Sequence, residues 1–64
     1  MNVGKTIKMK RVEKDIMVKE LAEAVGVTLQ QMSAVENGRK TASLKLLRKI
    51  AKELDCSLHE FIEE

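Results

Sequence analysis

Two helix signals lie only two residues apart near the middle of the chain, and they constrain the fold more than any other feature. The segment LAEAVGVTLQQMSAVENG covers residues 21–38, and its first half has the apolar spacing of one buried helix face. Gly26 then suits the left-handed conformation that ends many helices. Thr28 and Gln31 form a T-x-x-Q capping box, which starts a new helix. We therefore expect one helix over about 18–25 and a second beginning at Thr28, joined by a tight turn.

The remaining segments are also predicted to be helical, because the chain has no proline and almost no Thr, Tyr, Val or Ile alternating at period two. Further helices are expected over about 4–14 and 42–54, and a fifth opens at the S-x-x-E box of Ser57 and Glu60. The predicted fold class is all-α, with five short helices around one core. The residues expected to be buried are Ile7, Val12, Leu21, Ala22, Val25, Met32, Val35, Leu44, Leu47, Ile50, Ala51, Leu54, Leu58, Phe61 and, as a further candidate, Ile62.

Length and cysteine content exclude several classes of protein. Sixty-four residues predict one domain, 1–64, and leave no room for a sensing domain, so no small-molecule ligand is expected. The single Cys56 cannot form an internal disulfide, and no Cys/His pair has metal-ligand spacing, so neither metal nor cofactor is expected. The longest apolar runs are three residues, which predicts a cytoplasmic protein without a membrane span. No catalytic triad, phosphate loop or carboxylate pair stands out, and His59 lacks a partner, so we expect no enzyme.

Positive charge gathers in two blocks. The chain has a net charge of +2, but residues 1–19 carry a net +4 and residues 36–52 a net +5. Residues 20–35 carry −2 and residues 53–64 carry −5. The two basic blocks flank an uncharged run at 28–35 and indicate an anionic partner, although either block alone is equally consistent with a solvated helix face.

The helix expected from Thr28 has an outer face without charge. At about 100° per residue, Met32 and Val35 point toward the core. The opposite side carries Leu29, Gln30, Ser33 and Ala34. A helix in the DNA major groove uses amides and hydroxyls for base edges and small or apolar groups for thymine methyls. The pattern therefore favours DNA binding, and packing against another protein subunit is the alternative.

These residues carry a family resemblance. The segment VKELAEAVGVTLQQMSAVEN, residues 18–37, resembles the helix-turn-helix motif of the lambda-repressor and Cro-like (XRE) regulators. The apolar, small and turn positions of that motif are filled by Leu21, Ala22, Val25, Gly26, Val27, Met32 and Val35. The flanking segments TIKMKRVEKDI and ENGRKTASLKLLRKIAKELDCSLHEFI resemble the family's first and later helices. The resemblance implies a compact five-helix, lambda-repressor-like domain whose third helix enters the major groove while the second crosses the backbone.

The resemblance also implies roles for individual residues. Base reading is expected for Leu29, Gln30, Gln31, Ser33 and Ala34. Phosphate binding is expected for Lys10, Lys19, Asn37, Arg39 and Lys40. Arg11 and Glu36 match a partly buried ion pair between the first helix and the end of the third.

The sequence departs from the family pattern at several loop positions. Met17 and Val18 stand where the family has Ser or Thr followed by Gln, so the Gln contact with DNA cannot be carried over and a frayed start of the second helix is expected. Asp15 replaces a common Gly and Ala42 a common Pro, which predicts looser or differently shaped connections.

We expect a sequence-specific DNA-binding transcriptional regulator that occupies a pseudo-palindromic operator in double-stranded DNA, and the habits of the family favour a repressor. A homodimer through the C-terminal region is expected. The expected interface residues are Leu58, Phe61 and Ile62, with the alternative that Phe61 completes the core of the monomer. The alternative function is a protein-interaction module, of the antitoxin or anti-regulator type, that keeps the fold and presents the uncharged face to a protein.

Overall fold

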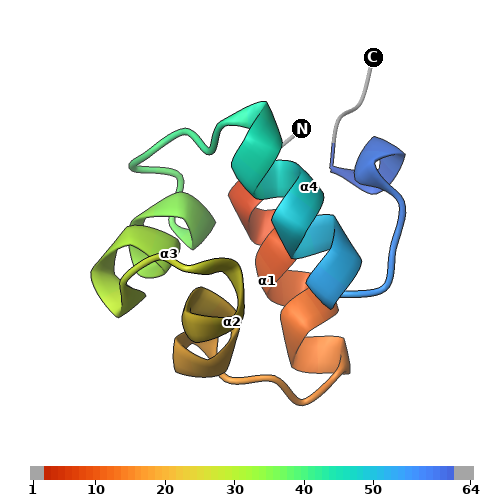
Figure 1. Ribbon diagram of the computed structural model, residues 1–64, viewed down its shortest axis with the longest axis horizontal. Coiled ribbons are helices and arrows are strands. Elements are labelled where there is room, and N and C mark those ends of the chain that lie inside the picture. Colours follow the sequence, from red (N-terminus) through yellow and green to blue (C-terminus); the bar gives the residue numbers. More distant parts are fainter. Residues whose placement is uncertain (1–2, 62–64) are drawn as a thin grey trace.

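Four α-helices and a 3-10 turn make up residues 3–61, the part of the chain that the computed structural model describes (Figure 1). The helices and the turn are α1 (Val3–Glu13), α2 (Val18–Val25), α3 (Leu29–Glu36), α4 (Leu44–Glu53) and η1 (Leu58–Glu60). Helix α2 packs against both α3 and α4, α1 packs against α3, and η1 packs against α4. In Figure 1, α2 and α3 lie on one side of the molecule and η1 on the other. The all-α class is confirmed.

The predicted fifth helix is wrong, because η1 is a single 3-10 turn. Its capping box does form: the Ser57 N–H donates to Glu60 Oε2 at 3.1 Å, and the His59 N–H donates to Ser57 Oγ at 3.2 Å. The Phe61 N–H then bonds to the Leu58 carbonyl, three residues back, and the Phe61 side chain is fully buried. The box therefore fixes where the turn begins, and the bond to the third residue back closes a 3-10 turn instead of an α-helical one.

The core is one cluster of buried side chains from the four α-helices, with Leu54 just after α4 and Phe61 just after η1. Its buried apolar members are Ile7, Leu21, Ala22, Val25, Met32, Val35, Leu47, Ile50, Ala51, Leu54 and Phe61, all of which were predicted. Leu58 is half-buried against this cluster. Ile62 lies outside the described residues.

Two core predictions are wrong. Val12 is 54% exposed, because it follows Ile7 by five residues and so lies about 140° around the helix from that buried side chain. Leu44 is 49% exposed although it lies three residues before Leu47, on the same face of the helix. It is the first residue of α4, and since helical side chains lean toward the N-terminus, its side chain projects beyond the start of the helix.

The turn between α2 and α3 forms as the sequence predicts. Gly26 has a φ of 80°, in the left-handed region, and its N–H bonds to carbonyls of the last turn of α2. The Gln31 N–H donates to Thr28 Oγ1 at 3.0 Å, and the Thr28 N–H donates to Gln31 Oε1 at 2.9 Å. These reciprocal bonds satisfy two amides that the start of a helix would otherwise leave without partners. The start and direction of α3 are thereby fixed locally.

The start of α2 is restrained by a contact that the sequence prediction overlooked. Met17 has no side-chain oxygen to cap the helix, but its own N–H donates to Glu20 Oε1 at 2.8 Å. This is the second half of a capping box, and it opposes the fraying expected from Met17 and Val18. In the preceding turn, Asp15 adopts a φ of 57°, a conformation that aspartate tolerates better than most side chains.

Candidate nucleic-acid interface

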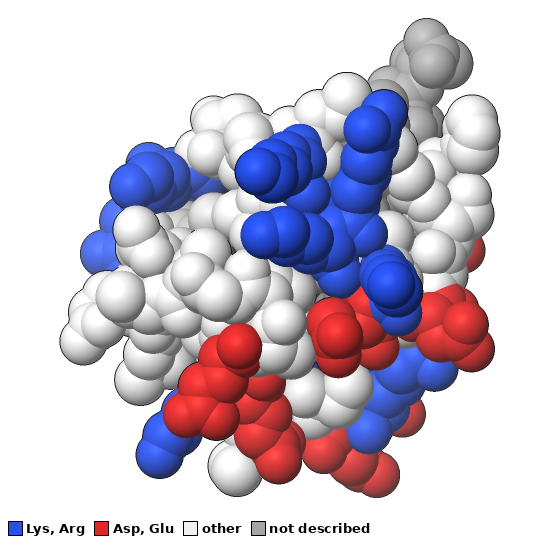
Figure 2. Space-filling model, in the orientation of Figure 1, with Lys and Arg blue, Asp and Glu red and all other residues white. Residues whose placement is uncertain are grey.

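One face of α3 is buried and the other is accessible, and the inward and outward faces are those predicted from the sequence. Met32, Val35 and Glu36 are buried, whereas Gln30 is exposed and Leu29 is 42% exposed. In Figure 2 the surface over α3, at the left, is largely white, with Lys and Arg side chains above it and along α4. An uncharged helix face thus lies beside positively charged surface.

The accessible side of α3 is hollowed. A shallow, open depression is lined by Leu29, Gln30, Ser33, Ala34 and Arg39. Four of the five residues predicted to read bases therefore share one surface. The fifth, Gln31, is absent from the lining, and its side-chain oxygen is already bonded to the Thr28 N–H.

The loop after α3 folds back over the end of the helix. Gly38 has a φ of 77°, which glycine adopts without strain. The N–H groups of Arg39 and Lys40 both donate to the Ala34 carbonyl, at 2.9 and 3.2 Å. Asn37 Nδ2 also donates to Ser33 Oγ at 3.4 Å, a long contact that links the loop to the helix face. The backbone of the loop is thus anchored to the same turn of α3 that lines the depression.

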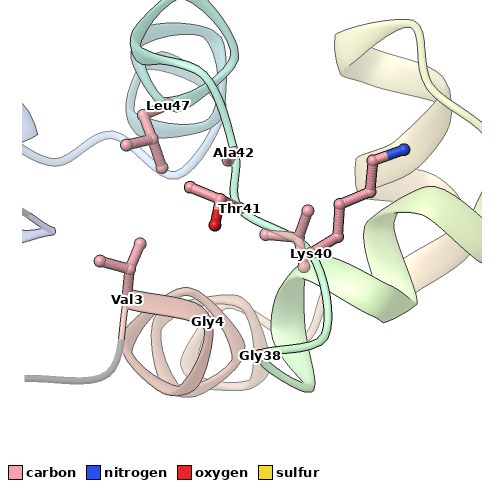
Figure 3. Close-up of a pocket in the computed structure, with 8 residues that line it drawn as sticks. Val3, Gly4, Gly38, Lys40, Thr41, Ala42 and Leu47 are labelled. Carbon is pink, nitrogen blue, oxygen red and sulfur yellow. The ribbon is translucent and has the colours of Figure 1, made fainter.

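A second hollow lies beside that loop, and Lys40 lines it while Arg39 does not. It is lined by Val3, Gly4, Val35, Gly38, Lys40, Thr41, Ala42 and Leu47, from α1, α3, the loop and α4. Figure 3 shows the Thr41 hydroxyl turned into this hollow and the Lys40 ammonium directed away from it. The ammonium of Lys40 thus lies outside this hollow, and Lys40 is not among the residues that line the depression on α3.

The end of α3 is tied to α1 by an ion pair that the family resemblance implies. Arg11 Nε donates to Glu36 Oε2 at 2.7 Å and Arg11 Nη2 donates to Glu36 Oε1 at 3.1 Å, while Nη1 donates to the Ile16 carbonyl at 2.7 Å. The side chains of Arg11 and Glu36 are only 12% and 5% exposed. This fork-to-fork geometry is the strong form of a charged hydrogen bond, and it fixes α3 relative to α1 and the following turn.

Lys10 has another partner than the one expected. Its ammonium pairs with the Glu60 carboxylate of η1, which lies across the molecule from α3 in Figure 1. The hydrogen bond to Glu60 raises the pKa of Lys10, and the same bond, with the one from Ser57, lowers the pKa of Glu60. We therefore leave Lys10 out of the proposed phosphate contacts. Lys19, on α2, is exposed and stays among them.

The residues expected at a dimer interface differ in their burial. The Phe61 side chain is fully buried within the protomer, so its assignment to an interface is corrected: it completes the core, the alternative that the sequence left open. Leu58 keeps part of its surface accessible. Ile62 lies beyond the described residues.

Over residues 3–61, no helix is long and apolar enough to cross a membrane. The same residues contain no group of three or more His, Cys, Asp and Glu side chains that could hold a metal ion. Cys56 is half-buried, and burial raises the pKa of its thiol.

Comparison with known proteins gives a family and relatives. The helix-turn-helix family model HTH_3 matches residues 7–61. The HTH-type transcriptional regulator SinR of Bacillus subtilis (strain 168) is 36% identical over 63 residues, which are 97% of this chain and 57% of SinR. This chain therefore spans little more than half the length of that relative.

Solved structures show the same lambda-repressor-like fold. The clp gene regulator ClgR from Corynebacterium glutamicum superposes with a TM-score of 0.92 at 31% identity, over 95% of this chain and 65% of ClgR. SinR, described as the master regulator for biofilm formation, has been solved in complex with DNA. That structure superposes with a TM-score of 0.88 at 35% identity, over 95% of this chain and 98% of the SinR chain. SinR in complex with the SinI protein superposes with a TM-score of 0.88 at 36% identity, over 97% of this chain and 61% of that SinR chain.

Proposed function

Because this chain belongs to the helix-turn-helix family HTH_3, of the XRE type, we propose that it is a sequence-specific DNA-binding transcriptional regulator. The relatives it matches are transcriptional regulators rather than enzymes, and one of them, SinR, has been solved with DNA. The observation that carries the proposal is the hollowed, uncharged face of α3 beside positive charge. Such a face offers hydrogen-bonding groups to base edges while the flanking cations hold phosphates.

In this proposal α3 lies in the major groove and the depression faces the bases. Gln30 and Ser33 supply hydrogen bonds, and Leu29 and Ala34 supply apolar contact with thymine methyls. Lys19, Asn37 and Lys40 bind phosphates around it. The protein acts as a repressor that occupies a pseudo-palindromic operator in the cytoplasm, as a homodimer with one recognition helix in each half-site.

A gel shift with random duplex DNA at low salt tests DNA binding, and selection from a random pool then tests sequence preference. Ala34→Glu places a carboxylate on the α3 face and should abolish retardation by like-charge repulsion with phosphates. Ala24→Glu adds the same charge on exposed α2 surface beside α4 and should retain binding. No retardation of the wild-type chain at micromolar concentration would contradict the proposal.

A protein-interaction module is the second candidate, and one observation favours it. Met17 is 62% exposed and Val18 is half-buried at the positions where the family has Ser or Thr followed by Gln, so the contact of that Gln with DNA is missing. The relative SinR has also been solved with a protein, SinI. The gel shift separates the candidates, because a module of this kind would leave the DNA free.

A further inference from the structure

Arg39 lines the depression on α3 together with the residues proposed to read bases. The family resemblance implies a phosphate contact for it, because it follows the recognition helix in a loop. The structure brings it back to the helix: its N–H is bonded to the Ala34 carbonyl at 2.9 Å, after a left-handed turn at Gly38. Arg39 thus belongs to the same concave surface as Gln30 and Ala34.

Arg39 is also available to a ligand. Within residues 3–61 its side chain makes no hydrogen bond or ion pair, whereas Arg11 is fully engaged with Glu36 and Ile16. Among the residues that line the depression it alone carries a charge. The anchored backbone limits the directions that this exposed side chain can take, which lowers the ordering cost on binding.

The other residues of the depression lack a group suited to guanine. The Gln30 amide can form two hydrogen bonds with adenine N6 and N7, and Leu29 and Ala34 can contact thymine methyls. The Ser33 hydroxyl can bond to any base and does not discriminate among them. Guanine presents two acceptors, O6 and N7, to the major groove, and a guanidinium donates to both at once. We propose that Arg39 is a specificity-determining residue that reads a guanine in each half-site, rather than a phosphate contact. This inference rests on the proposed DNA-binding function.

Lys40 provides the matched comparison. Its N–H bonds to the same Ala34 carbonyl, at 3.2 Å, but Lys40 does not line the depression on α3, and Figure 3 shows its ammonium directed away from the neighbouring hollow. Two neighbouring cations on one anchored loop therefore serve different groups: Arg39 a base and Lys40 a phosphate.

The test selects binding sites from a random DNA pool with the wild-type chain, Arg39→Ala and Lys40→Ala. Arg39→Ala should lose the preference for guanine at one position per half-site and bind the wild-type site roughly 5- to 150-fold more weakly, the range of a bidentate base contact. Lys40→Ala should keep the sequence logo and weaken all sequences about equally. Circular dichroism of the exposed-site variants checks that each one folds.

A second measurement identifies the atom that is read. Replacing that guanine by 7-deazaguanine removes the N7 acceptor, so the wild-type chain should lose affinity while Arg39→Ala should show no further loss. An unchanged logo for Arg39→Ala, or equal losses from 7-deazaguanine in both proteins, overturns the inference while leaving DNA binding intact. Failure of the wild-type chain to select any site would instead overturn the proposed function and this inference with it.

Discussion

Gln30 and Gln31 are neighbouring amides with different surroundings, and they should respond differently to the same substitution. Gln30→Ala removes a bidentate contact worth about 1–3 kcal/mol of base discrimination, so it should relax the preference at one base pair per half-site. Gln31→Ala removes half of the α3 capping box, so it should lower the free energy of unfolding by about 1 kcal/mol and keep the logo. Binding-site selection and thermal unfolding measure the two effects. A changed logo for Gln31→Ala would show that this residue also reads DNA.

Arg11→Ala should be strongly destabilising. It leaves Glu36, only 5% exposed, without its partner, and removing one member of a buried pair costs about 3–5 kcal/mol. The total free energy of unfolding of a small domain is only about 5–15 kcal/mol. Thermal unfolding by circular dichroism measures the loss, with Lys14→Ala, just after α1, as an exposed control. A midpoint close to that of the wild type would contradict the burial of the pair.

At the scale of elements, the close approach of α1 and α3 depends on Gly4. A Cβ at this position would lie 2.7 Å from the Glu36 carbonyl oxygen and nearer still to that of Val35, both backbone atoms of α3. Helix propensity alone predicts that Gly4→Ala stabilises α1 by up to about 1 kcal/mol. The contact predicts the opposite sign, a loss of about 1–3 kcal/mol from overpacking. Chemical denaturation decides between the signs, and a stabilised variant would disprove the close contact.

The tether between η1 and α1 should depend on pH. The folded-state pKa of Glu60 is lowered by its bonds to Lys10 and Ser57, so its contribution to stability is present above the unfolded-state pKa and is lost as pH falls through the folded-state value. The pKa of Lys10 is raised, so its contribution is lost only at high pH. The difference in thermal midpoint between the wild type and Glu60→Gln should therefore vanish in acid. Because both groups are solvent-accessible, the difference at neutral pH should be small and should fall with added salt.

The elements that local signals define were predictable from the sequence, and those that depend on distant contacts were not. Gly26 and the Thr28 box act within a few residues, so the turn into α3 was predicted correctly. The Ser57 box indicated the start of η1 but not that a single 3-10 turn, instead of an α-helix, follows it. The role of Gln31 in the cap followed from the same kind of box, yet the family pattern placed it at the DNA. The pairing of Lys10 with Glu60 spans fifty residues of sequence, and no local pattern indicates it.

For the whole molecule, the expected oligomer has less apolar surface than the sequence suggested. Phe61 belongs to the core, which leaves Leu58 as the described member of the expected interface. The outer side of α4 carries Lys45, Arg48 and Lys49, all exposed, and like charges there oppose the approach of a second α4. A weak dimer that the operator assembles is therefore expected.

Sedimentation equilibrium at tens of micromolar, with and without operator DNA, tests this expectation. The chain alone should be mainly monomeric, and two protomers should bind one pseudo-palindromic duplex with their recognition helices about 34 Å apart. Leu58→Asp should weaken the cooperativity of the second protomer and leave binding to an isolated half-site unchanged. One protomer on a full operator, at concentrations that saturate a half-site, would disprove the dimer.

The reciprocal bonds between Thr28 and Gln31 set a boundary for anyone who wishes to retarget this protein to new DNA. Diversifying the whole of α3 would discard its cap in most clones and mix folding failures with failures of recognition. Randomising positions 29, 30, 33, 34 and 39, while Thr28 and Gln31 stay fixed, varies every side chain that lines the depression and spares the bonds that start the helix. Most variants in such a combinatorial library should fold, so the variants selected for binding would differ only in how their side chains recognise the base edges.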